Sequence, residues 1–140
     1  MTLYAETSAV LAWLLGEPAG GMVRRSIDGA ARVVSSVLTI VEAERAIARA
    51  EGLALITPAA AAQLRGLAAR TIAQWSLLEV VPSVHRRAGQ VFPRETVRTL
   101  DALHLASALE LLMLHPDLRV LTLNDRIAAN LEPLGLAREG

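Results

Sequence analysis

The chain has 140 residues, close to the usual size of one domain, and we expect residues 1–140 to form a single domain. Its 14 basic residues are all arginine and balance 14 acidic residues. There is therefore no overall basic footprint, and chemistry that needs a lysine amine, such as Schiff-base catalysis, is excluded. The absence of cysteine excludes disulfides, thiol catalysis and cysteine-rich metal sites, and it favours a cytoplasmic location.

Hydrophobicity is high, and it comes from small and aliphatic side chains. Hydrophobic residues make up 53% of the chain and aromatic residues only 3%, so the core must consist mostly of Leu, Ala, Val and Ile. The longest uninterrupted apolar run covers residues 9–15, far short of the roughly 18 residues that a membrane span needs. We expect no membrane insertion, and the surplus of apolar residues predicts that a partner or a second copy covers some surface.

Hydrophobic periodicity and helix-breaking residues divide the chain into alternating strands and helices. In chain order, we expect a strand at 2–5, helices at 7–15 and 19–28, a strand at 32–35, a helix from 36 or 39 to 52, a helix from 58 to 72, a strand at 77–81, helices at 83–91 and 96–114, a strand at 120–123 and a helix at 125–134. Gly16-Glu17-Pro18, Gly52 and His115-Pro116 end helices, and Thr57-Pro58 supplies a cap followed by a first-turn proline.

This alternation is typical of right-handed βαβ units. It predicts an α/β sandwich in which helices cover both faces of a short, mostly parallel sheet. The helices on either side of residues 52–57 are expected to form a helical hairpin.

Three acidic residues are candidates for a functional site, because ligands of parallel-sheet proteins bind outside the carboxyl ends of the strands. Glu6 directly follows the first strand; the alternative is an acid that merely favours a helix N-terminus. Asp101 lies on an otherwise apolar helix face, where it either has a function or is satisfied by free backbone amides. Glu42 lies early in its helix, where a solvated acid paired with Arg45 or Arg49 is the alternative.

A further polar corner occurs at Asn124-Asp125, where a strand gives way to a helix and one of the two residues is expected as the N-cap. Carboxylates gathered in one crevice repel one another and raise each other's pKa unless a cation lies among them. Oxygen donors suit Mg²⁺ or Mn²⁺ rather than zinc. Taken together, the acids predict a divalent-metal site.

Four segments resemble, in order and spacing, the PIN-domain ribonucleases, and specifically the VapC-type toxins of bacterial toxin–antitoxin pairs. The segments are YAETSA at 4–9, LTIVE at 38–42, LDALHLA at 100–106 and LTLNDR at 121–126, with Leu134-Gly135-Leu136 behind them. The third segment is the most specific, and the similarity covers nearly the whole chain. The resemblance implies a PIN-like sandwich and an endoribonuclease toxin that hydrolyses RNA phosphodiester bonds at an acidic Mg²⁺ or Mn²⁺ pocket.

Residue by residue, Glu6, Glu42 and Asp101 match the acidic positions of this family, and Asn124 aligns with the fourth, beside Asp125. The resemblance implies that Glu6 and Asp101 bind the metal directly and that Glu42 binds it directly or through water. Asn124 or Asp125 would orient a coordinated water. Two positions depart from the pattern, because the first acid is normally Asp and Asn124 lacks a charge. These departures support an alternative, a catalytically impaired PIN-fold protein that acts only by binding RNA or a partner.

Other polar residues near these corners are candidates for supporting roles. Thr7, Ser8 and Thr122 are candidates for hydrogen bonds to the acids or to a phosphate, or for helix caps and strand-end hydroxyls. His104 lies three residues after Asp101, and we expect it to be packed and hydrogen-bonded rather than a general base.

A basic stretch before the third segment contains Arg86, Arg87, Arg94 and Arg98, which either bind RNA phosphates near the pocket or form a solvated face. With so few aromatic residues, substrate choice is expected to depend on RNA shape and backbone. The family resemblance further implies a cognate antitoxin protein, an RNA substrate such as tRNA or another structured RNA, and a homodimer.

Overall fold

A computed structural model describes all 140 residues as alternating strands and helices. In chain order, the elements are β1 (Thr2–Ala5), α1 (Thr7–Leu14), α2 (Gly20–Gly29), β2 (Arg32–Ser36), α3 (Leu38–Gly52), α4 (Pro58–Ile72), β3 (Ser76–Leu78), α5 (Pro82–Ala88), α6 (Thr99–Leu114), β4 (Arg119–Leu121), α7 (Asp125–Leu131), the 3-10 turn η1 (Glu132–Leu134) and β5 (Ala137–Arg138). The predicted α/β class is confirmed.

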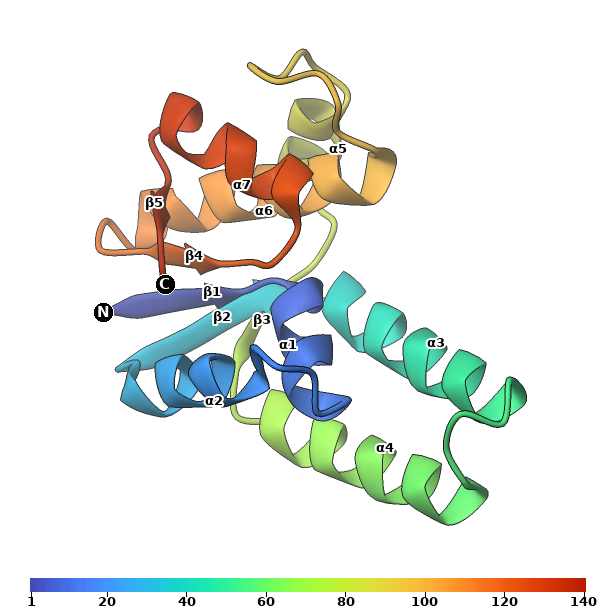
Figure 1. Ribbon diagram of the computed structural model, residues 1–140. Helices are drawn as coiled ribbons and strands as arrows, with labels where there is room; N and C mark the ends of the chain where they lie inside the picture. Colours follow the sequence, from blue (N-terminus) through green and yellow to red (C-terminus); the bar gives the residue numbers. More distant parts are fainter.

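The strands form one five-stranded sheet in the order β3-β2-β1-β4-β5, and every neighbouring pair is parallel. Because β1 is the central strand, Leu3 pairs with Val33 on one side and with Arg119 on the other. Helices α5, α6 and α7 cover one face of the sheet (Figure 1). Helices α1 and α2 cover the other, and the antiparallel hairpin of α3 and α4 extends beside α1.

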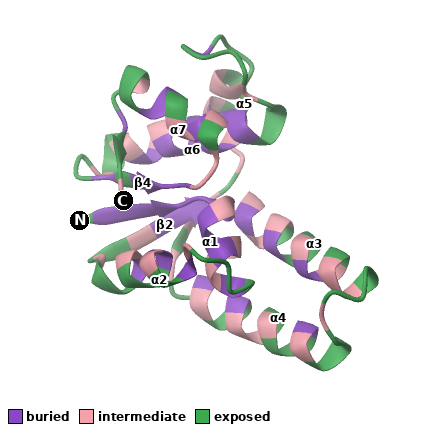
Figure 2. Cartoon of the chain, viewed as in Figure 1, coloured by how far each residue is buried: buried purple, intermediate pink, exposed green.

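The central strand divides the core between the two faces because successive side chains of a strand point in opposite directions. Tyr4 packs in the cluster built around α6 and α7, whereas Leu3 and Ala5 pack in clusters with α1. All three residues are completely buried, and Figure 2 shows burial along the whole of β1. The outer faces of α3 and α4 are largely exposed. No helix has the length and hydrophobicity that crossing a membrane requires.

Several element boundaries differ from the predictions; α5 ends at Ala88 rather than at residue 91, and β4 ends at Leu121 rather than at residue 123. Strand β3 ends at Leu78, because its partner β2 ends opposite at Ser36 and offers no further pairing. Helix α6 begins at Thr99 rather than near residue 96, and the last helix ends at Leu131 and continues as η1. Strand β5 was not predicted; its two residues are exposed and carry no alternating pattern.

The N-terminus lies at the edge of the sheet where β1 begins, and Figure 1 shows the C-terminus close to it. The backbone N–H of Thr2 donates to Oδ2 of Asp117 at 3.1 Å, and the amino group of Met1 lies 3.7 Å from the same oxygen. Hydrogen bonding from the Thr2 side chain, then the nearby positive charge and the backbone N–H of Thr2, lower the pKa of the Asp117 carboxyl. The contact joins the start of β1 to the turn before β4.

Replacement of Gly20 by alanine is expected to destabilise the protein by about 1–3 kcal/mol, a typical range for overpacking. The added Cβ would lie 2.7 Å from the backbone oxygen of Ala12, and backbone atoms at the contact of α1 and α2 cannot move aside cheaply. Gly21→Ala on the same helix is the control, because its Cβ would meet only the Arg25 side chain at 3.5 Å. Urea unfolding that ranks the two variants equally would contradict the prediction.

Asp117→Asn is expected to lower the free energy of unfolding at neutral pH but not in strong acid. A carboxyl whose pKa is lowered by folding stabilises the protein above its unfolded pKa of about 4, and this contribution is lost as the pH falls through the folded pKa. The difference in urea midpoint between wild type and Asp117→Asn should therefore shrink from pH 7 to pH 3. A difference that does not change with pH would show that the carboxylate charge is irrelevant there.

Candidate functional site

A hollow of about 470 Å³ opens at the edge of the sheet where β1 and β4 end. The first half of α3 and the first turn of α6 form its other walls. Its lining consists of Glu6, Thr7, Ser8, Leu11, Glu42, Arg98, Thr99, Leu100, Asp101, His104, Asn124 and Arg126. The parallel strands thus bring together the three predicted acids and the predicted asparagine, which lie up to 118 residues apart in the sequence (124 − 6 = 118).

A second hollow, of about 740 Å³, lies between α3 and α4. Its walls are mostly hydrophobic, and none of the predicted acids lines it. The smaller, polar hollow is therefore the candidate site for chemistry.

Glu6 follows β1 and lies at the N-cap position of α1, but its side chain does not cap the helix. It is 3% exposed. Its Oε2 accepts hydrogen bonds from Thr122, at 2.7 Å, and from Ser8, so two of the predicted hydroxyls contact this acid. Its Oε1 has no hydrogen-bond partner in the protein. Since no fully buried side-chain oxygen or nitrogen lacks a partner, Oε1 retains access to the hollow.

Glu42 projects from α3 toward α6. Its Oε1 lies 2.6 Å from Nε2 of His104 and accepts a hydrogen bond from the third predicted hydroxyl, that of Thr7, at 2.9 Å. Neither Arg45 nor Arg49 pairs with Glu42, so the surface-pair alternative is wrong for this residue. The second oxygen, Oε2, has no partner within the protein, and the side chain is 24% exposed.

Asp101, in the first turn of α6, has both carboxylate oxygens occupied. Oδ2 accepts from Nε of Arg126 at 2.6 Å and from the backbone N–H of Arg98 at 2.9 Å. Oδ1 accepts from the side-chain amide of Asn124 at 2.9 Å and is 3.4 Å from a second nitrogen of Arg126. Burial alone would raise the pKa of Asp101, but these donors together lower it below its usual value.

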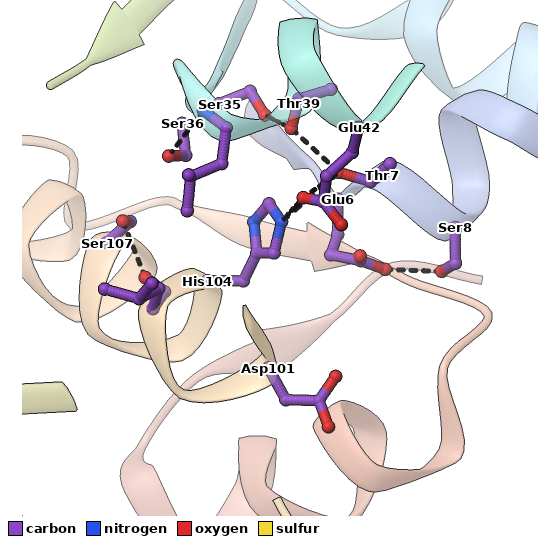
Figure 3. A network of polar contacts seen from close by, with 12 residues as sticks. Glu6, Thr7, Ser8, Ser35, Ser36, Thr39, Glu42, Asp101, His104 and Ser107 are labelled. Atoms are coloured by element: carbon purple, nitrogen blue, oxygen red, sulfur yellow. Dashed lines mark hydrogen bonds and ion pairs between the residues drawn. The ribbon is translucent and has the colours of Figure 1, made fainter. Parts of the chain in front are cut away.

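The carboxylates share one hollow without converging on one point. Figure 3 shows Glu6 and Glu42 close to Thr7 and His104, whereas Asp101 stands apart from them. No three acidic or histidine side chains are close enough, as they stand, to hold one metal ion. The guanidinium of Arg126 is paired with Asp101 and contacts both of its carboxylate oxygens.

Asn124 and Asp125 have different places. Asn124 is the N-cap of α7, as predicted for this corner, and its Oδ1 accepts from the backbone N–H groups of Arg126 and Ile127. The side-chain NH₂ group of Asn124, and not its side-chain oxygen, therefore faces Asp101. Asp125 is exposed in the first turn of α7 and does not line the hollow.

Only Arg98 of the predicted basic stretch lines the hollow. Arg87 instead lies over the ring of Phe92, 4.4 Å from its centre, and donates to the Val91 carbonyl. Arg86 and Arg94 are exposed away from the hollow. Two arginines of the stretch are therefore exposed on the surface, Arg87 stabilises the local loop, and Arg98 alone lies at the site.

The sequence pattern indicated no role for Arg126 at the site or for Tyr4 behind it. Arg126 lies in the fourth segment, and its position two residues after the aligned asparagine is the signal that could have placed it near the corner. Tyr4 contacts His104 inside the core, and its position in the strand before Glu6 gave no signal of that contact. His104 is packed and hydrogen-bonded, as expected.

Comparisons with known proteins agree with this geometry. The PIN domain family matches residues 3–131. Ribonuclease VapC46 of Mycobacterium tuberculosis (strain ATCC 25618 / H37Rv) is 35% identical over 136 residues, which cover 96% of this chain and 94% of that protein. The family match spans all four segments that carry the predicted acids. The chain therefore belongs to the PIN-domain family and is of the VapC type.

Proposed function

We propose that this protein is the endoribonuclease toxin of a toxin–antitoxin pair and that it cleaves RNA phosphodiester bonds at the hollow beside β1 and β4. The observation that carries the proposal is the meeting of Glu6, Glu42 and Asp101 in one polar hollow at the carboxyl edge of a parallel sheet. Such an edge is where open α/β folds bind their ligands. The match to a named VapC ribonuclease over 96% of the chain supports the same activity.

The donor set suits Mg²⁺ or Mn²⁺. Oε1 of Glu6 and Oε2 of Glu42 are carboxylate oxygens without partners in the protein, and hard cations of this class prefer oxygen ligands. Asp101 would supply a third ligand once the guanidinium of Arg126 moves aside. A bound cation would lower the pKa of a water molecule and neutralise charge on the phosphate.

The residues of the chain then have separate tasks. Glu6, Glu42 and Asp101 hold the cation, and the hydroxyls of Thr7, Ser8 and Thr122 fix the two glutamates in place. Arg98 and the displaced Arg126 provide positive charge for RNA phosphates at the rim.

At the fourth acidic position we propose Asn124 rather than the exposed Asp125. Asn124 keeps the corner in shape by capping α7 and donating to Asp101, and it does not orient water through its oxygen.

Cleavage of structured RNAs, including tRNAs, by the purified protein is expected in Mg²⁺ or Mn²⁺ and not in EDTA. Asp101→Asn should lower the rate by roughly 100-fold or more, because one charged ligand is lost. Glu110→Gln, which changes an acid of the same helix outside the hollow, is the control. Full activity of Asp101→Asn, in a preparation free of other nucleases, would overturn the proposed site.

Arg126→Gln is expected to tighten Mn²⁺ binding by roughly 10-fold. In the wild type, Mn²⁺ must displace the hydrogen bonds of Arg126 to Asp101, and hydrogen bonds to charged groups contribute about 1.5–3 kcal/mol. The variant removes this competition. Titration of Mn²⁺ followed by electron paramagnetic resonance measures this without RNA. Arg25→Gln, on the exposed surface of α2, controls for the general change in charge. Unchanged Mn²⁺ affinity in Arg126→Gln would show that Asp101 does not contribute to the metal site.

A second candidate function is RNA or partner binding without cleavage. The ion pair of Asp101 with Arg126 and the uncharged Asn124 favour it, since both reduce the negative charge that attracts a metal. The cleavage experiment separates the two, because a protein that binds the RNA panel but cuts nothing in either metal fits this second function alone.

The remaining parts of the proposal follow from family membership. We propose that residues 1–140 form one PIN-like domain, that an antitoxin protein is the partner, and that the toxin acts in the cytoplasm as a homodimer. The mostly hydrophobic hollow between α3 and α4 and exposed side chains such as Val41 provide apolar surface for such contacts.

A further inference from the structure

A continuous chain of polar side chains runs from the core of the protein to the candidate site. Oη of Tyr4 lies 2.8 Å from Nδ1 of His104, and Nε2 of His104 lies 2.6 Å from Oε1 of Glu42. Tyr4 is completely buried and His104 is 2% exposed, whereas Glu42 lines the hollow. The two rings meet edge to face, with centres 6.1 Å apart and planes at 81°. His104 therefore links the core cluster that contains Tyr4 to the site, and Figure 3 shows its ring beside Glu42.

The contacts define which nitrogen of His104 carries the proton. The Thr7 hydroxyl donates its proton to Oε1 of Glu42, so it presents a lone pair to Nε2 at 3.2 Å. The carboxylate and this lone pair both face Nε2, which must therefore be the protonated nitrogen. Nδ1 is then free to accept the proton of the Tyr4 hydroxyl.

Two donors thus converge on a single oxygen of Glu42. His104 and Thr7 both donate to Oε1, and no group in the protein donates to Oε2. The two bonds fix the rotation of the carboxylate, and only Oε2 is left for a ligand. Glu6 has the same arrangement, with Ser8 and Thr122 on Oε2, but both of its partners are short hydroxyl side chains at the site itself.

We propose that His104, held as the Nε2–H tautomer by Glu42 and Thr7 and accepting from Tyr4 at Nδ1, is the residue that positions Glu42 to present one oxygen to the metal ion. The role of His104 toward a metal ion rests on the proposed function, whereas the assignment of its tautomer does not. His104 acts through Glu42 and does not touch RNA or the reacting phosphate. Partners of this kind around metal ligands usually change metal affinity by 10–100-fold when removed.

The first test is the protonation of His104 in the metal-free protein, read from long-range ¹H–¹⁵N spectra at pH 8. Wild type should show a protonated Nε2 and an unprotonated Nδ1. Tyr4→Phe removes the donor to Nδ1 but leaves both acceptors at Nε2, so the Nε2–H form should persist while the ¹⁵N shift of Nδ1 changes with the loss of its hydrogen bond. A wild-type His104 with Nδ1 protonated, alone or together with Nε2, would overturn the proposal.

The second test compares two replacements of His104 by Mn²⁺ titration. His104→Met fills the space without a donor and should weaken Mn²⁺ binding by 10–100-fold. His104→Gln places an amide donor near the position of Nε2 and should recover much of the affinity. The control is His85→Gln on α5, which is exposed and outside the hollow.

Circular dichroism at the titration temperature separates positioning from folding. If both His104 variants are folded and bind Mn²⁺ as tightly as wild type does, the positioning role is wrong. Equal weakening by Met and Gln would also overturn it, because a merely structural role does not depend on the donor. If wild type binds no Mn²⁺, the proposed metal function fails instead, and the tautomer of His104 in wild type and Tyr4→Phe decides whether the relay to Glu42 exists.

Discussion

The need to satisfy largely buried carboxylates with hydrogen-bond donors is the constraint on which the polar edge of this protein depends. The parallel sheet brings Glu6, Glu42 and Asp101 into one hollow, where burial weakens the screening by water. Each acid is stabilised by different donors: hydroxyls at Glu6, a histidine and a hydroxyl at Glu42, and an arginine with two amides at Asp101. Arg126 neutralises Asp101 with a full positive charge, whereas Glu6 and Glu42 each keep one carboxylate oxygen without a hydrogen-bond partner.

Most of the fold could be predicted from the sequence because its signals are local. Apolar periodicity marks the helices, and Thr57-Pro58 begins α4 where a cap and a first-turn proline were expected, with Thr57 accepting from the backbone of Ala60. The boundaries that differ depend on partners distant in the sequence. Strand β3 ends where β2 ends, and the two residues of β5 form a strand only because β4 lies beside them.

The site was predictable as a set of residues but not as a set of contacts. The end of the first strand pointed to Glu6, an otherwise apolar helix face pointed to Asp101, and the family resemblance supported Glu42 as the third acid. These signals could not show that Arg126 reaches back to Asp101, or that His104 contacts a glutamate 62 residues earlier. Such pairings depend on side-chain rotamers at places where helices α3, α6 and α7 meet, and no periodic pattern encodes them.

The absence of lysine has a practical consequence. Because all basic side chains are arginine, no side chain in these 140 residues carries an amine. A dye or a crosslinker that reacts with amines would therefore leave every side chain around the hollow unmodified, including Arg98 and Arg126.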